Sequence, residues 1–313
     1  MTRYFVTGGA GFIGSHLVER LLSDGGQVTV YDNLVSGRKE WLEHHQNNDN
    51  FSFTEADLLD AETLEQAMKG HDVVWHLGAN TDIPTGNRVT DLDLKNCTIA
   101  TRNVLEAMRH NDIDKILFAS SACVYGDTPP QALSEAFGPL LPINLYGAGK
   151  LACEGLISSY SHLFGIKTWM FRFANVVGAR MGHGVIYDFI HKLKKNPAEL
   201  EVLGDGKQEK PFFLVEDCVD GMLCAFQKAD VGCDVFNLGC DSFTTVTRIA
   251  QIVIEEMGLK NVKIRYTGGK RGWPGDAPVV HFNVDKMKGL GWRAGHTSDD
   301  AVREATRRLI GKA

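Results

Sequence analysis

Tyr146 and Lys150 stand four residues apart at the start of a segment that the sequence predicts to be helical. On a helix, this spacing puts both side chains on one face, with β-carbons about 5–6 Å apart. A phenol with a pKa near 10 is a poor base at neutral pH, but a neighbouring ammonium group favours the phenolate and lowers that pKa. We therefore expect Tyr146 to take up and return a proton with the help of Lys150.

Ser121 adds a third polar group to this pair. It directly follows the run 115–120, which is typical of a β-strand. Open α/β sheets place ligand-binding groups at the carboxyl ends of their strands, so Ser121 can bond the same substrate oxygen as Tyr146. Because Tyr-x-x-x-Lys alone recurs often by chance, it is the combination with Ser121 that predicts a catalytic site.

A glycine-rich turn near the N-terminus predicts a dinucleotide site. Gly8, Gly11 and Gly14 follow the run 4–7 and open a segment with helical spacing. Glycine lets backbone amides approach a pyrophosphate at a helix N-terminus, because no side chain blocks the ligand.

The choice between NAD and NADP depends on Asp32, at the end of the second expected strand. Its carboxylate can accept hydrogen bonds from the adenosine ribose and repel a 2′-phosphate, which favours NAD, although Arg38 could serve a 2′-phosphate. Asp57 and Leu58 follow the third expected strand and either reach the adenine edge or cap the helix expected over 61–68. Further NAD contacts are expected from Phe12, Ile13, Asn33, Ser36 and Gly37.

The elements that must position these residues alternate in type. Short β-branched runs alternate with amphipathic segments, which is the pattern of parallel strands joined by crossover helices. We expect strands over 4–7, 28–32, 51–55, 73–77, 115–120 and 167–173, and helices over 12–23, 92–110 and 146–164. The predicted fold class is α/β, a doubly wound parallel Rossmann sheet with a smaller mixed α/β substrate domain.

A turn-rich stretch over 178–184 breaks the alternation. We expect residues 1–175 to form the NAD-binding domain and residues 176–313 to form the substrate domain. Residues 212–236, with a strand over 212–215 and a helix after Asp217, are candidates to return to the first domain.

Composition narrows the classes of function. The chain of 313 residues is 43% hydrophobic and 23% charged, as is usual for globular proteins, and its net charge of -6 disfavours nucleic acid as the main partner. We find no apolar window of about 20 residues and no signal peptide, so no membrane association is expected. Seven cysteines without a Cys-x-x-Cys pair favour reduced thiols and a cytoplasmic location. The pair His44 and His45 lacks spaced partners, so we expect no metal.

Four segments together resemble the extended short-chain dehydrogenase/reductase family, and within it the nucleotide-sugar epimerases related to UDP-glucose 4-epimerase. These segments are 6–17, 120–126, 146–150 and 171–178. The resemblance covers nearly the whole chain, and it implies that Ser121, Tyr146 and Lys150 are catalytic, with Lys150 also holding the nicotinamide ribose.

The same resemblance implies further contacts. Leu77 and Ala79 would lie beside the cofactor, Asn96 would be the family's structural Asn in the central helix, and Asn175 would contact the substrate diphosphate or sugar. By the same resemblance, the helices over 92–110 and 146–164 imply a homodimer through a four-helix bundle.

The C-terminal match is looser. Lys210 stands where the family usually has an Arg that binds the nucleotide phosphates, and Pro211 where it has an Asp. A Lys can still pair a phosphate as a point charge, without the bidentate fork of Arg. Arg271 resembles the second phosphate ligand and Asp276 a ribose contact, and the alternative for each is a solvated surface charge.

The resemblance implies NAD-dependent 4-epimerisation of a UDP-hexose of the glucose or galactose type, by oxidation to a 4-keto sugar and re-reduction. UDP-glucuronate 4-epimerase and nucleotide-sugar dehydratase or decarboxylase are the alternatives. Relatives that dehydrate place Asp-Glu directly after the catalytic hydroxyl residue, and decarboxylating relatives keep the Glu, whereas this chain has Ala122 and Cys123. A catalytically silent NAD-binding regulator is the non-enzyme alternative, and the intact triad counts against it.

Overall fold

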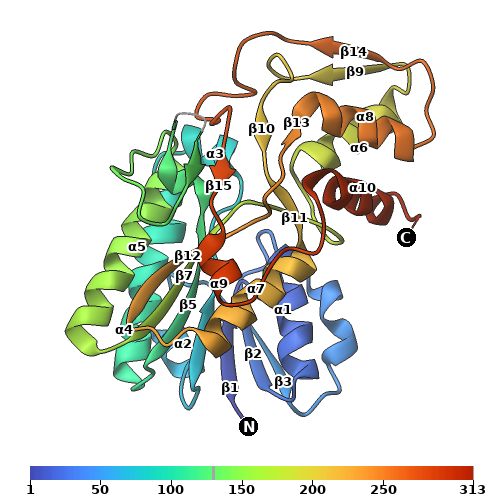
Figure 1. Ribbon diagram of the computed structural model, residues 1–313. Helices are drawn as coiled ribbons and strands as arrows, with labels where there is room; N and C mark the ends of the chain where they lie inside the picture. The colour runs from blue at the N-terminus through green and yellow to red at the C-terminus, as the bar shows by residue number, and fades with distance from the viewer. Residues whose placement is uncertain (129–130, 313) are drawn as a thin grey trace. The chain divides into compact units, whose positions relative to one another are not determined.

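The computed structural model describes residues 1–128 and 131–312, which fold into two compact units (Figure 1). Unit 1 comprises Met1–Val124, Leu145–Arg172 and Met222–Phe236, and unit 2 comprises Tyr125–Asn144, Phe173–Gly221 and the chain from Asn237 onward. The chain passes into unit 2 after Arg172, close to the boundary expected after residue 175. Residues 125–144, however, cluster with unit 2, and the segment that returns to unit 1 begins at Met222 instead of 212. Local strand pairs within unit 2 explain both differences, as described below.

Unit 1 is built on a seven-stranded sheet in the order β12-β7-β5-β4-β1-β2-β3. The neighbours β3–β2, β2–β1, β1–β4 and β4–β5 pair in parallel. The strands are β1 (Arg3–Thr7), β2 (Gln27–Asp32), β3 (Phe51–Glu55), β4 (Val73–His76), β5 (Lys115–Ser121), β7 (Lys167–Phe173) and β12 (Cys233–Leu238). The strand order reverses between β1 and β4, which makes their carboxyl ends the expected ligand site. The predicted α/β fold class is confirmed.

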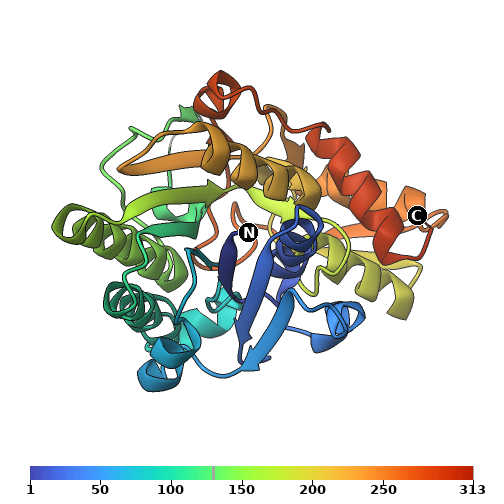
Figure 2. The same cartoon turned by 90° about the horizontal axis from the view of Figure 1, so that it is seen from below.

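Helices cover both faces of this sheet (Figures 1 and 2). Alternate residues along each strand point to opposite faces. On one face, Val74 and Phe118 join a core with α2, α4 and α5, and on the other, Trp75 and Trp169 contact Phe226 of α7. The helices are α1 (Phe12–Ser23), α2 (Ala61–Ala67), α3 (Ile83–Arg88), α4 (Ala100–His110), α5 (Leu145–Phe164) and α7 (Val215–Lys228).

Short helical turns connect these elements. The helix expected over 92–110 is helical from Leu92 onward, but its residues Leu94–Ile99 form a π-helical stretch, η3, before α4 begins. The 3-10 turns η1 (Lys39–Trp41) and η2 (Glu43–His45) follow β2, and η4 (Ala122–Tyr125) follows β5. A π-helical turn inside a helix is frequent at functional sites, and it shifts which side chains face the neighbouring helix.

Among its described residues, unit 2 has four two-stranded sheets rather than one large one. Three pairs are parallel, β8 (Asn175–Val177) with β11 (Phe212–Leu214), β9 (Glu199–Val202) with β14 (Lys263–Tyr266), and β6 (Ala132–Leu133) with β15 (His281–Phe282). The fourth, β10 (Glu209–Lys210) with β13 (Thr244–Thr245), is antiparallel. The pair β6–β15 places 125–144 in unit 2, and the pair β8–β11 places 212–214 there. The helix expected after Asp217 begins at Val215, directly after β11.

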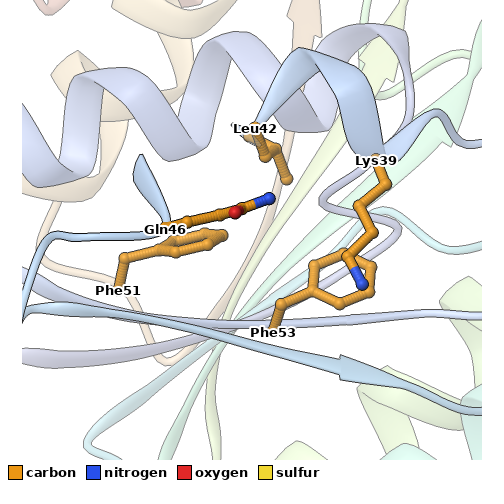
Figure 3. Close-up of a pocket in the computed structure, with 5 residues that line it drawn as sticks. All are labelled: Lys39, Leu42, Gln46, Phe51 and Phe53. Atoms are coloured by element: carbon orange, nitrogen blue, oxygen red, sulfur yellow. The ribbon is translucent and has the colours of Figure 1, made fainter. Parts of the chain in front are cut away.

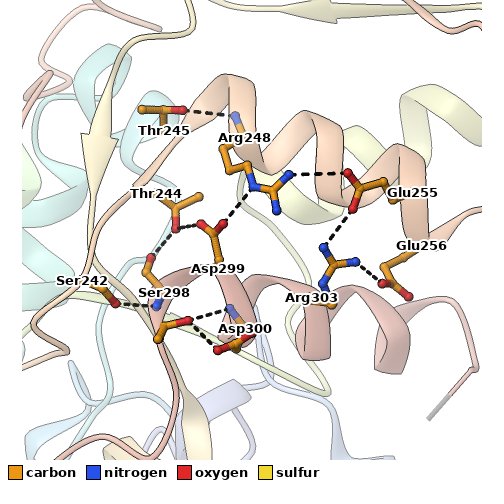
Figure 4. A network of polar contacts seen from close by, with 11 residues as sticks. Ser242, Thr244, Thr245, Arg248, Glu255, Glu256, Ser298, Asp299, Asp300 and Arg303 are labelled. Atoms are coloured by element: carbon orange, nitrogen blue, oxygen red, sulfur yellow. Dashed lines mark hydrogen bonds and ion pairs between the residues drawn. The ribbon is translucent and has the colours of Figure 1, made fainter.

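The helices of unit 2 are α6 (Val185–Lys195), α8 (Val246–Glu256), α9 (Asp285–Gly289) and α10 (Ser298–Leu309). Polar side chains join α8 to α10 (Figure 4). Arg248 donates to Asp299 at 2.8 Å, and Arg303 donates to Glu255 at 2.9 Å. The Thr245 hydroxyl oxygen caps α8 by accepting from the Arg248 amide. Such networks fix helix packing more than isolated surface pairs do.

Within the described residues, no helix is both long enough and apolar enough to cross a membrane.

A pocket of about 230 Å³ lies beside the edge strand β3 (Figure 3). Its walls are Lys39, Leu42, Gln46, Phe51 and Phe53. The Lys39 ammonium lies 5.1 Å from the centre of the Phe53 ring. None of the residues expected to bind cofactor or substrate lines this pocket.

Candidate active site

The glycine-rich turn joins β1 to the N-terminus of α1. Gly8 has a φ of +68°, and a β-carbon there would lie 2.7 Å from the amide nitrogen of Gly78. A β-carbon on Gly14 would lie 2.1 Å from the carbonyl oxygen of Gly8. Gly11 precedes α1 without a side-chain cap, so the first amides of α1 remain available to an anion. The turn therefore fits the pyrophosphate of a dinucleotide, and it tolerates no side chain at Gly8 or Gly14.

Asp32 closes this site from the end of β2. It is buried, and its carboxylate accepts from the amides of Ala10 at 3.0 Å and Leu34 at 2.9 Å. Burial raises the pKa of Asp32, while these two hydrogen bonds oppose the shift. A β-carbon on Gly37 would lie 2.8 Å from the same carboxylate. The structure thus brings the glycine-rich turn, Asp32 and the segment with Ser36 and Gly37 together.

Asp57 lies beside Asn33, which donates to its carboxylate at 2.9 Å. The alternative role of Asp57 as a helix cap is wrong, because Asp60 caps α2 by accepting from the Thr63 amide at 3.1 Å. Leu58 lies against Gly78, whose hypothetical β-carbon would be 2.8 Å from it. The expected adenine-site residues therefore lie next to the end of β4.

A buried chain of hydrogen bonds, which sequence reasoning missed, runs through His76. The Gly78 amide donates to the Thr7 hydroxyl at 3.1 Å, and that hydroxyl lies 2.7 Å from Nδ1 of His76. Nε2 of His76 lies 3.0 Å from the Thr101 hydroxyl, which donates to the Cys153 sulfur. Burial, with a smaller contribution from the Lys150 charge, lowers the pKa of His76 to about 3. A neutral histidine thus holds together the ends of β1 and β4 and the segment with Leu77 and Ala79.

Ser121, Tyr146 and Lys150 meet at the carboxyl end of β5. The side chains of Ser121 and Tyr146 are hydrogen-bonded. The Lys150 ammonium is buried, donates to the Ala119 carbonyl oxygen at 2.6 Å and lies 5.7 Å from the centre of the Tyr146 ring. The arrangement can hold a substrate hydroxyl between two polar side chains and place a positive charge beside the phenol.

The expected lowering of the Tyr146 pKa is not what the structure shows. Burial of the phenol raises its pKa well above 10, and the nearby thiols of Cys123 and Cys97 add to this shift. The hydrogen bond with Ser121 acts in the opposite direction. Residue spacing indicated that the Lys150 ammonium lies near the phenol, but not how far the phenol is buried. The expectation therefore included the effect of the charge on the pKa and left out the effect of burial.

Asn96 lies in η3, within the π-helical stretch that precedes α4. Its side chain donates to the Leu92 carbonyl oxygen at 3.0 Å, one turn back on its own helix. The next residue, Cys97, is buried, and a β-carbon on Gly149 would lie 3.3 Å from its own β-carbon. Cys97 therefore packs against α5 at Gly149, the residue that precedes Lys150, and Asp93 lies against the same glycine.

The expected substrate residues gather in unit 2. Lys210 forms an ion pair with Asp276, and Arg271 donates to the Asp276 backbone carbonyl oxygen and to the Asp127 carboxylate. Asp127 was missed, since 144 residues separate it from Arg271. Asn175 donates to the Pro211 carbonyl oxygen at 3.1 Å, next to Lys210 in the chain. Two cations and two carboxylates thus lie together in unit 2, each cation paired with a carboxylate.

The pair His44 and His45 has a partner that the sequence did not reveal. Glu19 of α1 lies 3.2 Å from Nε2 of His44, and ligand atoms of these three residues lie within 4.8 Å of one another. Such a group could hold a metal ion, and the expected absence of a metal stays a prediction.

Comparison with known proteins places this geometry in a family. Residues 4–239 match the NAD dependent epimerase/dehydratase family. A protein of Methanocaldococcus jannaschii, provisionally named a UDP-glucose 4-epimerase, is 34% identical over 92% of this chain and 92% of its own length. A UDP-glucuronic acid decarboxylase of Arabidopsis thaliana is 34% identical over 84% of this chain and 59% of its own length.

A solved structure has the same fold over nearly the whole chain. A UDP-galactose 4-epimerase is 38% identical, with a TM-score of 0.88 and 99% of both chains covered. The predicted resemblance to nucleotide-sugar epimerases is confirmed, and so is NAD as the cofactor of the family. With a turn that fits a dinucleotide at β1 and a Ser–Tyr–Lys site at β5, the chain belongs to the NAD dependent epimerase/dehydratase family of enzymes.

Proposed function

We propose that this enzyme interconverts UDP-glucose and UDP-galactose by inverting carbon 4 of the hexose. The observation that carries the proposal is the meeting of Ser121, Tyr146 and Lys150 at the end of β5, in a unit whose glycine-rich turn fits NAD. The names of the relatives, which act on UDP-sugars, support the substrate class.

In this proposal, Ser121 and Tyr146 bind the 4-hydroxyl of the hexose. Tyr146 removes the hydroxyl proton, and it returns the proton when the ketone is reduced on its other face. NAD supplies the reversible hydride acceptor. Lys150 stabilises the phenolate, because its ammonium lies near the Tyr146 ring in a buried site where charges interact strongly. Atoms balance over the cycle, since the proton removed from the 4-hydroxyl returns to that oxygen and the hydride removed from carbon 4 returns to carbon 4.

Two residues favour epimerisation over dehydration or decarboxylation. Both alternatives need further acid or base groups near the oxidised sugar, and related enzymes place carboxylates directly after the catalytic hydroxyl residue. Here η4 begins with Ala122 and Cys123, and the Cys123 amide donates to the Ser121 hydroxyl oxygen at 3.2 Å. Neither side chain carries a carboxylate. We infer that the 4-keto sugar can only be reduced again.

UDP-glucuronate tests this inference, because it is the sugar that a decarboxylase consumes. Mass spectrometry of the products should show no loss of carbon dioxide, and any turnover should give a sugar nucleotide of equal mass. A UDP-pentose among the products would establish the decarboxylase alternative. An equal-mass 4-epimer formed faster than the one from UDP-glucose would instead favour UDP-glucuronate 4-epimerase.

For the nucleotide, we propose that Lys210 and Arg271 bind the diphosphate and that Asp276 contacts the ribose. The carboxylates that now pair with both cations must share them with the ligand. We propose that Asn175 contributes beside Lys210. Unit 1 would then be the NAD-binding domain and unit 2 the substrate domain.

We also propose a cytoplasmic homodimer that pairs through η3–α4 and α5. All seven cysteines are free thiols, which agrees with a reducing compartment. Leu94 and Ile99 on η3, and Leu163 and Phe164 at the end of α5, are exposed apolar side chains. Light scattering of the purified protein should give twice the chain mass of 34.5 kDa. A monomer at micromolar concentration would contradict the dimer.

A further inference from the structure

A buried ion pair lies directly beside the catalytic serine. Glu154 of α5 and Arg172 of β7 are 6% and 3% exposed. The two oxygens of Glu154 accept from Nε of Arg172 at 3.0 Å and from its Nη2 at 2.7 Å. The first of these oxygens also accepts from the Ser120 hydroxyl at 2.6 Å. All three residues belong to unit 1, and none has a role in the proposed proton transfer.

The contacts of α5 with β5 follow a regular pattern. Tyr146, Lys150 and Glu154 recur every fourth residue on one side of α5, and they contact three consecutive residues of the strand. Tyr146 bonds Ser121, Lys150 donates to the Ala119 carbonyl oxygen, and Glu154 accepts from Ser120. Tyr146 and Lys150 must exchange partners with substrate and cofactor during the reaction, so Glu154 is the contact that can hold the register throughout.

Few of the titratable groups around Tyr146 and Lys150 carry a charge at neutral pH. The thiols of Cys97 and Cys153 have raised pKa values, about 11 for Cys153, and His76 has a pKa of about 3. These groups are therefore neutral at neutral pH. The Cys123 thiol is the further group that faces Tyr146 from η4.

Asp93, which is buried and accepts from Asn80 at 2.9 Å, is the other carboxylate near both catalytic residues. Glu154 and Arg172 add one negative and one positive charge that cancel. The intact pair therefore adds almost no net charge to the field that Lys150 exerts on the phenol, and losing either partner would leave one uncancelled charge.

We propose that Glu154 and Arg172 are positioning residues of the catalytic site: they fix the register of α5 on β5, and they hold a neutral pair that leaves Lys150 to act on Tyr146. The inference rests on the proposed role of Tyr146 as the group that moves the proton. A buried pair is a poor way to gain stability, because desolvation offsets much of the attraction, and so its presence here calls for a role in geometry.

The test uses variants that change the charge of the pair in opposite directions. Glu154→Gln leaves a net positive charge, which favours the phenolate, so the acid limb of the pH profile of kcat/KM should move to lower pH. Arg172→Met leaves a net negative charge, and the limb should move to higher pH. Each shift should be about half a unit to one unit, the effect of one charge across roughly two helical turns at an effective dielectric constant of about 20.

Matched variants separate charge and geometry from stability. Arg172→Lys keeps the charge without the fork, so it should lower kcat while leaving the pH profile in place. The double variant Glu154→Gln with Arg172→Met removes both charges and should return the limb to its original pH.

Two further variants leave the ion pair in place. Asp72→Asn breaks the exposed pair with Arg3 in the same unit and should leave the profile unchanged. Ser120→Ala keeps the ion pair, and it should lower kcat with little change in KM or in the melting temperature.

Shifts of opposite sign in the two single variants would support the proposal. Equal stability losses without a shift, or shifts of the same sign, would show that the pair is merely structural. If Glu154→Gln does not fold, Ser120→Ala and Arg172→Lys still decide the matter through kcat. If the parent enzyme converts no UDP-hexose, the proposed function fails by itself. Phenolate absorbance of the NAD-bound protein, measured against Tyr146→Phe, then tests the same charge effects without turnover.

Discussion

In the proposed mechanism the chemistry depends on Tyr146, and removing its hydroxyl oxygen tests that role. Tyr146→Phe deletes the hydroxyl that moves the proton while keeping the ring against its neighbours. We expect turnover to fall by about 10²–10⁴-fold, the usual contribution of a positioned acid–base group, with NAD still bound. Initial rates and calorimetric titration with NAD measure the two quantities.

Tyr160 supplies a matched control on the same helix. Its hydroxyl donates to Glu106 at 2.7 Å, whereas the Tyr146 hydroxyl is bonded to Ser121. Tyr160→Phe should therefore keep its turnover. Near-normal turnover in Tyr146→Phe would remove the phenol from the mechanism.

Residue spacing predicted part of the site and missed the rest for a physical reason. Ser121, Tyr146 and Lys150 were found because a strand end and a helix turn each leave a local signature. The bonds of Arg172 to Glu154 and of Arg271 to Asp127 join residues 18 and 144 positions apart, and no local pattern records them. The burial that raises the pKa of Tyr146 is likewise a property of the packed molecule.

At the scale of elements, the turn between β1 and α1 has no room for side chains. Gly14→Ala would place a β-carbon 2.1 Å from the Gly8 carbonyl oxygen, so the turn must open. We expect a loss of about 1–3 kcal/mol in the free energy of unfolding and a loss of NAD binding. Urea unfolding and calorimetry measure both effects.

Gly155 is the control helix glycine, since a β-carbon there meets nothing within 4 Å. Gly155→Ala should stabilise α5 by about 0.5–1 kcal/mol and leave NAD binding intact. Unchanged NAD affinity in Gly14→Ala would show that the turn does not cradle the cofactor.

His76 links β1, β4, α4 and α5, and it makes stability depend on pH. Its pKa is about 3 in the folded protein and near 6.5 in the unfolded chain. The unfolded chain thus binds a proton between these values that the folded protein excludes. The stability is complete above pH 6.5 and falls as the pH drops toward 3, by about 2 kcal/mol at pH 5.

His76→Gln should therefore reduce the difference in unfolding free energy between pH 7 and pH 5 by about 2 kcal/mol, as measured by urea unfolding. His162, exposed near the end of α5, is the control, and His162→Gln should keep the parent's pH dependence. The same slope in His76→Gln and in the parent would mean that the buried imidazole does not exclude the proton.

The expected elements were close to the observed ones where periodicity is strong. The helix 12–23 and the strands 51–55 and 167–173 have the predicted bounds, and β1, β2, β4 and β5 differ by a residue or so. The two-residue strand β6 was not predictable, because it pairs with β15, which lies far away in the sequence. The π-helical stretch Leu94–Ile99 inside the expected helix was not predicted either.

For the whole molecule, the strand order explains why the sites of unit 1 converge. The order reverses between β1 and β4, so the glycine-rich turn, the His76 chain and the end of β5 lie at one edge of the sheet. Unit 2 adds the cluster of Lys210 and Arg271, each paired with a carboxylate. In our account, the residues after Ser121 direct the proposed redox chemistry to epimerisation.

The most direct test of that account is incubation of the purified protein with NAD and UDP-glucose, with the products followed by proton NMR and mass spectrometry. We predict a single new sugar nucleotide of unchanged mass, UDP-galactose, approached from either side of the equilibrium and absent with Tyr146→Phe. Accumulation of a 4-keto-6-deoxy sugar that has lost water, or no conversion of either UDP-hexose, would contradict the proposed function.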